Sequence, residues 1–532
     1  MEDILSIGKK LGIDQDFIES YGRYMAKISL KALGSGKSKG KLILVTAMTP
    51  TKYGEGKTTT TIGLSQAFKK LGKKVSISIR EPSMGPCFGV KGGATGGGKS
   101  KVEPSDRINL MFTGDFPAIS GAHNLLSSMI QNHIYHGNKL QINPEQIVFP
   151  RAIDMNDRSL RDLILNAGGR KNGPLARDSF VITPASEIMA IMGFATGYDD
   201  LLKRLSRILI GYDYDGKPVY SGDLKAAGPM AAILSDALKP NLVQTTEGVP
   251  AFIHTGPFGN IAHGTSSILA AKLALNFSDY VITEAGFGSD LGAEKFINMV
   301  SRLGELEISA VVIVSTIRAM KFLGGSEDNE GISRGFLNLA KHYENIRNFN
   351  LEPVVAINRF PSDTDGEIEF LGCLMRKNNM PFQISEVFTK GGDGAISLAE
   401  TLLEKCDQKN GEINYTYNFD DETGKKIEKI GKGIYGVKEV EFSKKALSDI
   451  RRIEKNGYGK LPVCMAKSQY SLSGNTSGSD DNILRVTSAS VSSGAGFIVV
   501  FSGDIMTMPG LPKEPAAENI YIDGDGKIYN LE

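Results

Sequence analysis

Short runs of β-branched and other apolar residues recur along the chain, and they are separated by longer stretches that read as helices. This alternation predicts the buried strands of a parallel sheet that is covered by helices on both faces. The strand candidates are residues 41–47, 73–80, 279–285, 308–316 and 352–360, and each ends in polar side chains. Open α/β sheets bind ligands beyond the carboxyl ends of their strands, so we expect the functional site at that edge.

The first strand candidate leads into a loop and a helix that nearly match a phosphate-binding motif. In G-x-x-x-x-G-K-[ST], the second glycine is Gly56, but the position of the first glycine holds Thr51. Backbone amides near Gly56 can approach phosphate oxygens, Lys57 can reach the terminal phosphates, and Thr58 can bind magnesium at the helix N-terminus. An ordinary turn is the alternative, but the strand, loop and helix context favours phosphate binding. The predicted nucleotide-binding residues are Thr49, Pro50, Gly54, Glu55, Gly56, Lys57, Thr58 and Thr59.

These elements predict an α/β protein with a P-loop NTPase-like large domain, containing a mainly parallel sheet, and two smaller α/β domains. We place the domains at residues 1–345, 346–450 and 451–532, although no linker rich in proline and serine marks either boundary. The chain shows no repeat of fixed period.

Composition limits the partners of the protein. The 532 residues carry a net charge of only +1, so no global field would attract nucleic acid or an anionic membrane, and any anion site must be local. The N-terminal segment has early acidic residues and no apolar core of the kind found in secretory signals, and the apolar runs are too short to span a bilayer. We therefore expect a cytoplasmic protein with no membrane or nucleic-acid partner. The four cysteines, without paired metal spacing, favour reduced thiols: Cys87, Cys373, Cys406 and Cys464.

A second anion site is predicted where the strand candidate 73–80 ends. Arg80 and Glu81 follow this strand, which we expect to lie beside the strand that leads into the nucleotide loop, because sequential strands tend to be neighbours. A glycine-rich segment, residues 89–98, comes next and includes Gly92 and Gly93. Its glycines free the backbone to wrap closely around a ligand. A flexible surface loop is the equally weighted alternative for this segment.

Eight stretches, in order, resemble the formate–tetrahydrofolate ligase family over essentially the whole chain. They are TPTKYGEGKTT, REPSMGPCFGVKGGATGGG, FTGDFPAISGAHNLL, GPFGNIAHG, TEAGFGSDLGAEKF, STIRAMKFLGG, VVAINRFPSDTD and MTMPGLPKEPAAENI. The chain departs from the family pattern at Thr95 (alanine expected), Lys99 (tyrosine), Ser315 (alanine), Met320 (leucine) and Leu323 (histidine or asparagine). These differences concern details of the site and not the reaction.

The resemblance implies that the enzyme transfers the ATP γ-phosphoryl group to formate and then the formyl group to N10 of tetrahydrofolate. Formyl phosphate is the implied intermediate. In this chain, Lys57, Arg80 and Glu81 are then the catalytic residues, and the formyl phosphate contacts are Arg80, Lys57, Gly92 and Gly93. For Glu81, support of Arg80 is favoured slightly over a role as a base. The family also implies Mg²⁺ with ATP, here at Thr58, a monovalent cation (K⁺ or NH₄⁺) as activator, and a homotetramer.

In the family, two aromatic rings hold the pterin of the folate, and the matching positions here are Phe360 and Phe388. The second ring is normally tryptophan, but this chain has no tryptophan, so a smaller ring must stack there. Asp115 matches a folate-contacting carboxylate. The resemblance assigns residues 1–345 to nucleotide and formyl phosphate, and 346–450 to folate. Without the resemblance, both phenylalanines would be interpreted as core residues and the aspartate as a turn residue.

Several other polar residues are candidates with an equally plausible structural role. The three histidines could be acids or bases, the two carboxylates could reach magnesium, and the two cations could touch phosphate: His123, His254, His263, Glu284, Asp290, Arg318 and Lys321. Two other classes remain open, namely a P-loop switch ATPase and an acyl-phosphate-forming ligase for another carboxylate. The Arg80 segment followed by the glycine-rich stretch argues against the switch ATPase, which has no need of them.

Overall fold

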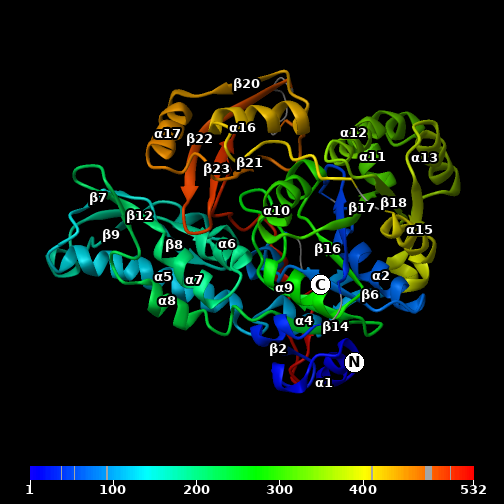
Figure 1. The fold of residues 1–532 in the computed structure, drawn as a ribbon, viewed down its shortest axis with the longest axis horizontal. Coiled ribbons are helices and arrows are strands. Elements are labelled where there is room, and N and C mark those ends of the chain that lie inside the picture. The colour runs from blue at the N-terminus through cyan, green and yellow to red at the C-terminus, as the bar shows by residue number, and fades with distance from the viewer. Residues whose placement is uncertain are drawn as a thin grey trace.

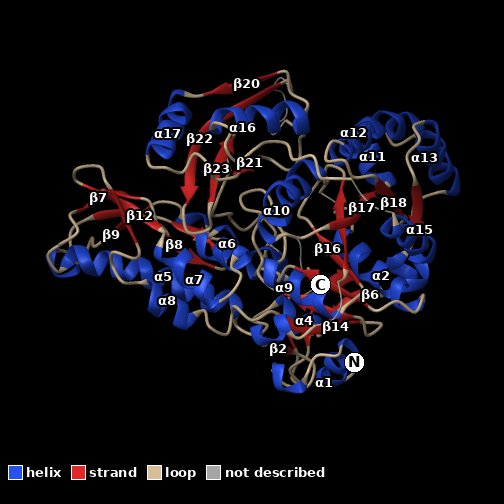
Figure 2. Cartoon of the chain, in the orientation of Figure 1, coloured by secondary structure: helices blue, strands red, loops and turns tan. Residues whose placement is uncertain are grey.

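The computed structural model describes residues 1–36, 39–52, 54–90, 94–408, 411–473, 482–503 and 505–531. It is a mixed α/β structure built on one large, mostly parallel sheet, with several small sheets around it (Figures 1 and 2). The large sheet has 12 strands. Its central strands run parallel, and the strands at the end that includes β1 are antiparallel.

All five strand candidates form neighbouring strands of this sheet. They are β4 (Val75–Ile79), β16 (Tyr280–Glu284), β3 (Lys41–Ala47), β17 (Ile308–Ser315) and β18 (Pro353–Asn358), in that spatial order. The sheet continues beyond them into strands that the sequence pattern did not identify. These are β1 (Ile18–Ser20), β2 (Ala26–Ile28), β5 (Gly96–Gly97), β6 (Ser100–Glu103), β14 (Asn241–Thr245), β15 (Pro250–Ile253) and β19 (Phe382–Ser385).

The prediction that β3 and β4 are neighbours in the sheet is wrong. Strand β16 lies between β3 and β4, and it pairs in parallel with both. Crossover connections leave room for a later strand to enter a sheet between two earlier ones, so order along the chain is an uncertain guide to pairing. The consequence is that Glu284, at the end of β16, occupies the place between the nucleotide loop and Arg80.

Side chains of the central strands alternate between two cores, one on each face of the sheet. On β3, Ile43 and Val45 pack with helices α2 and α15, whereas Leu42 and Leu44 belong to the core that includes α9 and α12. This alternation follows from the two-residue period of a strand, and burial on both faces explains the nearly continuous apolar runs in the sequence. The predicted two-sided covering by helices is confirmed.

The helices range in length from a single turn to α5, the longest. Helix α5 comes after β6 and the short α4, and it extends into the lobe at the left of Figure 1. In the described residues no helix has the length and apolar character needed to cross a membrane. The helices are α1 (Ile4–Leu11), α2 (Lys57–Lys70), α3 (Met84–Phe88), α4 (Ser105–Asn109), α5 (Asp115–Tyr135), α6 (Glu187–Phe194), α7 (Tyr198–Ser206), α8 (Ala227–Ile233), α9 (Ile268–Phe277), α10 (Arg302–Gly304), α11 (Ile317–Gly324), α12 (Asn329–Arg347), α13 (Asp365–Lys377), α14 (Val387–Lys390), α15 (Ile396–Asp407), α16 (Thr423–Ile430) and α17 (Lys444–Lys455).

Two peripheral lobes carry most of the small sheets. One follows α5 and contains β7 (Ile142–Ile147), β8 (Arg151–Ile153), β9 (Leu163–Leu165), β10 (Ala176–Asp178), β11 (Phe180–Ile182), β12 (Leu209–Asp213) and β13 (Pro218–Tyr220). The other, orange at the top of Figure 1, contains β20 (Glu439–Phe442), β21 (Val463–Ala466), β22 (Ile483–Ser492) and β23 (Phe497–Ser502), and a hairpin of β24 (Tyr521–Ile522) and β25 (Ile528–Tyr529) ends the chain.

Neither expected domain boundary coincides with a boundary between sheets. The large sheet continues across residue 346, because β18 and β19 extend it in parallel beyond β17. The boundary at residue 451 falls inside α17, and β20, which precedes it, pairs with β22, which follows it. Backbone hydrogen bonds between strands therefore connect the chain across both positions.

Helices α11 and α12 pack with their backbones in close approach because glycine lies at the contact. A Cβ atom added at Gly335 of α12 would overlap the backbone carbonyl group of Met320 on α11. A backbone atom cannot move aside as the end of a flexible side chain can, so any larger residue must separate the helices. This contact holds α12 close to α11, and α12 also contacts the nucleotide loop, as described below.

We expect Gly335→Ala to destabilise the protein by about 1–3 kcal/mol through this overlap, measured as a lower urea midpoint of unfolding. The matched control is Gly366→Ala in α13, where an added Cβ would meet no atom within 4 Å. Alanine is the better helix former, so the control should be neutral or slightly more stable. Equal midpoints for the two variants would contradict the close approach of α11 and α12.

Candidate active site

The nucleotide loop connects β3 to α2 at the carboxyl edge of the large sheet. Gly56 precedes the first residue of α2 and has a φ of 76°, a left-handed conformation that favours glycine. A Cβ atom at this position would also overlap the side-chain amide of Asn358, which donates a hydrogen bond of 3.1 Å to the Glu55 carbonyl oxygen. The loop thus turns into the N-terminus of α2 with its backbone close to the end of β18, and helix N-termini are where proteins commonly bind phosphate.

The carboxylate of Glu55 binds Thr51, the residue that stands where the motif expects its first glycine. Its Oε1 accepts hydrogen bonds from the Thr51 backbone amide at 2.9 Å and from the Thr51 hydroxyl at 3.0 Å. Its Oε2 accepts a bond of 2.8 Å from the hydroxyl of Thr316, which caps α11. Glu55 is only 3% exposed, so these charge-assisted bonds are shielded from water. Threonine at position 51 therefore contributes to closing the loop, in a way that glycine could not.

The beginning of the loop is attached to α12. Thr49 is buried, and its backbone amide and hydroxyl contact Asn338 and His342 of that helix. The sequence prediction placed Thr49 among the nucleotide-binding residues. The structure shows that its hydroxyl is already engaged by protein groups.

Glu284 connects the nucleotide loop with the predicted second anion site. One carboxylate oxygen accepts a hydrogen bond of 2.8 Å from Thr58, and the other lies 3.5 Å from the guanidinium of Arg80. Arg80 also donates to the Pro257 carbonyl oxygen at 3.3 Å, and its side chain is 24% exposed. This buried carboxylate orients the Thr58 hydroxyl and the Arg80 guanidinium toward the same edge of the sheet. The structure therefore brings Thr58 and Arg80 together, as predicted for adjacent anion sites.

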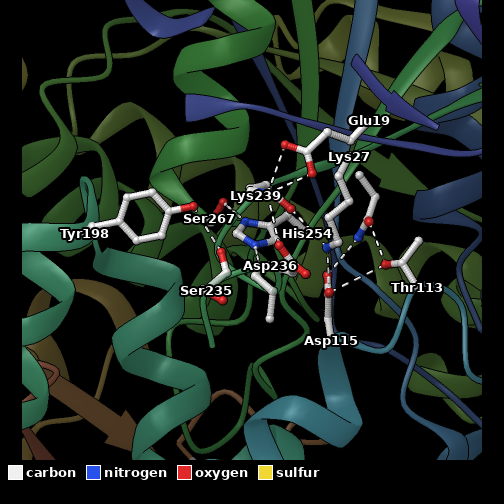
Figure 3. A network of polar contacts seen from close by, with 12 residues as sticks. Glu19, Lys27, Thr113, Asp115, Tyr198, Ser235, Asp236, Lys239, His254 and Ser267 are labelled. Atoms are coloured by element: carbon white, nitrogen blue, oxygen red, sulfur yellow. Dashed lines mark hydrogen bonds and ion pairs between the residues drawn. The ribbon is translucent and has the colours of Figure 1, made fainter. Parts of the chain in front are cut away.

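Asp115 belongs to a buried polar network that includes Lys27 and Thr113 (Figure 3), and Glu81 is a buried neighbour of Asp115. Asp115 forms an ion pair of 2.5 Å with Lys27 and accepts a hydrogen bond of 2.8 Å from Asn241. Burial, strengthened by the neighbouring Asp115 carboxylate, raises the pKa of Glu81 well above its usual range. The backbone amide of Glu81 donates to the Thr255 carbonyl oxygen at 2.7 Å, which fixes the end of β4. A neutral carboxyl group at this position is a poor base at neutral pH.

The glycine-rich segment is structured over its described part. Gly92 and Gly93 lie outside the described residues. Residues 96–97 form β5, which pairs in antiparallel fashion with β6, and the side chain of Asn109 bonds to both Ala94 and Thr95. From residue 94 onward the flexible-loop alternative is therefore wrong.

The two predicted folate rings lie at the carboxyl edge of the last two strands of the sheet. Phe360 follows β18, and the guanidinium of Arg318 stacks over its ring at 3.7 Å from the centroid. Phe388, in α14 after β19, is 45% exposed, so it is not a core residue. A Cβ atom added at Gly97 would lie 3.0 Å from the Phe388 ring, which places this ring against the glycine-rich hairpin.

The other candidates differ in their surroundings. His123 and His254 each contact a backbone carbonyl oxygen, whereas neither ring nitrogen of the buried His263 has a hydrogen-bond partner among the described residues. Burial lowers the pKa of His123 and His254 to about 4 and that of His263 to about 3, so all three rings are neutral at neutral pH. Asp290 pairs with the buried Lys467 at 2.6 Å, and Lys321 pairs with Glu367 at 2.5 Å, and these two ion pairs favour structural roles for both residues.

Among the described residues, no three histidine, cysteine, aspartate or glutamate side chains gather in a way that could hold a metal ion. At the N-terminus of α2, the Thr58 hydroxyl and the Glu284 carboxylate offer two hard oxygen donors side by side. Magnesium commonly takes only one or two protein ligands and completes its shell with phosphate oxygens and water. This donor pair fits a magnesium ion that arrives with a nucleotide.

Sequence reasoning missed four residues that position the loop, namely Thr316, Asn338, His342 and Asn358. Each is more than 260 positions from its loop partner. Thr316 and Asn358 lie at strand ends and inside two of the stretches that resemble the family, which was a signal for both, whereas no motif marked Asn338 and His342 on α12.

Comparisons with known proteins identify the family of this chain. A family model described as formate–tetrahydrofolate ligase matches residues 1–532. Proteins named formate–tetrahydrofolate ligase from Thermoplasma volcanium and Thermoplasma acidophilum are 60% and 61% identical to this chain, with full coverage of both sequences. The protein of that name from Picrophilus torridus is 52% identical over 99% of this chain and 100% of its own length. On these grounds the chain belongs to the formate–tetrahydrofolate ligase family.

Proposed function

We propose that this protein joins formate to N10 of tetrahydrofolate at the expense of ATP, producing 10-formyltetrahydrofolate, ADP and phosphate. The observation that carries this proposal is the Glu284 carboxylate, which connects the nucleotide loop at Thr58 with Arg80. A ligase of this kind must hold ATP and a small carboxylate close together, and a loop and an arginine that share one buried carboxylate provide two adjacent anion sites.

The proposed reaction has two steps. A formate oxygen first attacks the γ-phosphorus of ATP, and the bond from that phosphorus to the ADP oxygen breaks, which gives formyl phosphate. The N10 amine of tetrahydrofolate then attacks the formyl carbon, phosphate leaves with the bonding electron pair, and the nitrogen loses its proton. The first step is needed because a free carboxylate has no good leaving group.

The chain's own residues are proposed to stabilise the charge that moves in these steps. Lys57, at the start of α2, neutralises the transferring phosphoryl group, and Arg80 holds formate and then the acyl phosphate. Gly92 and Gly93 remain proposed formyl phosphate contacts. For Glu81 we propose support of Arg80 through the fixed end of β4, because its raised pKa disfavours the ionised form that a base requires.

Magnesium is proposed to bind with ATP at Thr58, where Glu284 offers a second oxygen donor. When bound, it would neutralise charge on the β- and γ-phosphates. The Thr58 hydroxyl would then give up its hydrogen bond to Glu284 and bind the metal with its oxygen. The P-loop NTPase-like character of the large domain is part of this proposal.

The pterin of the folate is proposed to stack on Phe360 and Phe388. The exposed ring of Phe388 is compatible with this role, whereas Arg318 already covers one face of Phe360 and would have to share the ring or move. Asp115 remains a proposed folate residue by family resemblance, but its ion pair with Lys27 and its 2% exposure support an indirect role.

Three further properties are proposed from the family alone: activation by K⁺ or NH₄⁺, a homotetrameric assembly, and a cytoplasmic location without nucleic-acid or membrane partners. Light scattering of the purified protein tests the assembly, and turnover in potassium against sodium salts tests the activation.

The proposed function predicts that ADP release from magnesium-ATP requires formate and tetrahydrofolate together. With formate alone, formyl phosphate should form at most once per site, because it has no acceptor. With tetrahydrofolate alone, no formyl phosphate should form, so in both cases the rate of ADP release should stay near its background. Coupled measurement of ADP with each substrate omitted in turn checks this. Turnover that ignores both substrates would indicate a switch ATPase, and turnover supported by another carboxylate in place of formate would indicate a different acyl-phosphate ligase.

Replacing Lys57 by glutamine should lower turnover by roughly 100-fold or more, because a preorganised charge on the phosphoryl group contributes a few kcal/mol to transition-state stabilisation. The matched control is Lys73→Gln, in the exposed segment just beyond α2. The control should keep normal turnover. Near-normal turnover in a folded Lys57→Gln protein would reject the role of this residue.

Phe388→Ala should weaken tetrahydrofolate binding by about 1–3 kcal/mol, with nucleobase stacking on aromatic rings as the nearest analogue. Removing a core phenylalanine costs about 3–5 kcal/mol of stability. The Phe388 ring is 45% exposed, so the thermal midpoint of Phe388→Ala should fall far less than it would for a core site. Phe388→Trp should bind folate at least as well as the parent. Tyr214→Ala, at a 62% exposed ring outside the proposed site, serves as control. Unchanged folate affinity in Phe388→Ala would show that stacking occurs elsewhere.

A further inference from the structure

Helix α12 contacts the beginning of the nucleotide loop through Asn338 and His342, and the Asn338 amide makes two of the hydrogen bonds. The backbone amide of Thr49 donates to Oδ1 of Asn338 at 3.2 Å, and Nδ2 of Asn338 donates to the Thr49 hydroxyl at 2.8 Å. Thr49 is 2% exposed, whereas Asn338 is half-buried. One side chain therefore fixes both the backbone and the hydroxyl of the residue from which the loop departs.

His342 lies one turn further along α12 and supports the same hydroxyl. Its Nε2 is 3.0 Å from the Thr49 hydroxyl oxygen, and its Nδ1 is 2.7 Å from the hydroxyl oxygen of Ser289. Burial lowers the pKa of His342 to about 4, so the ring is neutral and only one nitrogen carries a proton.

The surrounding donors favour one assignment of this proton, with Nδ1 as its carrier. The Thr49 oxygen already accepts a hydrogen from Asn338, and Ser289 is placed to donate its own hydrogen to the His342 carbonyl oxygen at 3.3 Å. The consistent arrangement has Nδ1–H donating to Ser289 and the Thr49 hydroxyl donating to Nε2. With the hydrogens assigned in this way, every bond in the chain from Asn338 to Ser289 has one donor and one acceptor.

Ser289 and Asp290 begin the π-helix η6 (Ser289–Ala293), which extends this network toward the C-terminal lobe. Asp290 lies 3.9 Å from the His342 ring and accepts a hydrogen bond of 2.6 Å from Lys467, which follows β21. Lys467 also donates to the carbonyl oxygens of Ser468 and Ser471. A buried ion pair whose ammonium donors are satisfied thus lies beside the Nδ1 side of the His342 ring, beyond hydrogen-bond distance.

We infer that Asn338 and His342 are positioning residues for ATP, which hold the nucleotide loop in its phosphate-binding conformation through Thr49. This inference rests on the proposed function of the loop. Neither residue needs to touch the nucleotide, because the loop binds phosphate through backbone amides whose direction depends on where the loop begins. Small displacements of a preorganised site cost affinity out of proportion to their size.

The test compares Asn338→Ala with Leu337→Ala, its neighbour on the exposed face of α12, where the side chain is 71% exposed. Titration of the full-length proteins with magnesium-ADP should show roughly 5- to 20-fold weaker binding for Asn338→Ala, as expected for two lost hydrogen bonds. Binding by Leu337→Ala should equal that of the parent. In steady-state assays, KM for ATP should rise by a similar factor while KM for formate and tetrahydrofolate stays constant.

A double-mutant cycle with Thr49→Val separates positioning from general stability. If Asn338 acts through Thr49, the fold loss of magnesium-ADP affinity in the double variant should be smaller than the product of the fold losses in the two single variants. Unchanged ADP affinity in Asn338→Ala, multiplicative effects in the cycle, or a loss of affinity matched by a large drop in thermal midpoint would each overturn the inference. Because ADP binding needs neither formate nor folate, these results are independent of whether the proposed ligase reaction is confirmed.

Discussion

The carboxylate of Glu55 is the interaction on which the nucleotide loop depends. It joins Thr51 at the beginning of the loop with Thr316 at the end of β17, and it is shielded from water. A buried carboxylate is costly unless donors satisfy it, and here three donors from two strand ends do so. The loop consequently has a fixed path between two neighbouring strands of the sheet. This path leads directly into the N-terminus of α2, and an anion is favoured at the N-terminus of a helix.

The order of strands gives this loop its chemical context. Because β16 enters the sheet between β3 and β4, its terminal residue Glu284 stands between the loop and Arg80. Had β3 and β4 been neighbours, no carboxylate would stand between the N-terminus of α2 and the guanidinium of Arg80. The inserted strand instead supplies one carboxylate that accepts a hydrogen bond from the Thr58 hydroxyl and pairs with the Arg80 cation.

The sequence was sufficient to predict the central strands, since residues such as Leu42 and Ile43 belong to runs that are apolar on both faces. It was also sufficient for the turn from β3 into α2, because Gly54, Gly56 and Lys57 lie close together in the sequence. It did not predict strand order, because pairing depends on crossover geometry and not on local pattern. Contacts such as that of Glu55 with Thr316 could not be predicted either, since they join residues 261 positions apart. The environment of Asp115 was unpredictable for the same reason, because its partner Lys27 is 88 positions away.

The most direct measurement is a crystal structure of the protein with magnesium-ADP, formate and inorganic phosphate. The account predicts that the β-phosphate lies on the backbone amides of residues 54–58, that Thr58 turns from Glu284 to the metal, and that a second anion lies at Arg80. It also predicts that the Glu55 contacts to Thr51 and Thr316 persist. Nucleotide bound away from this loop, or a bound state in which Glu55 has left both threonines, would contradict the account.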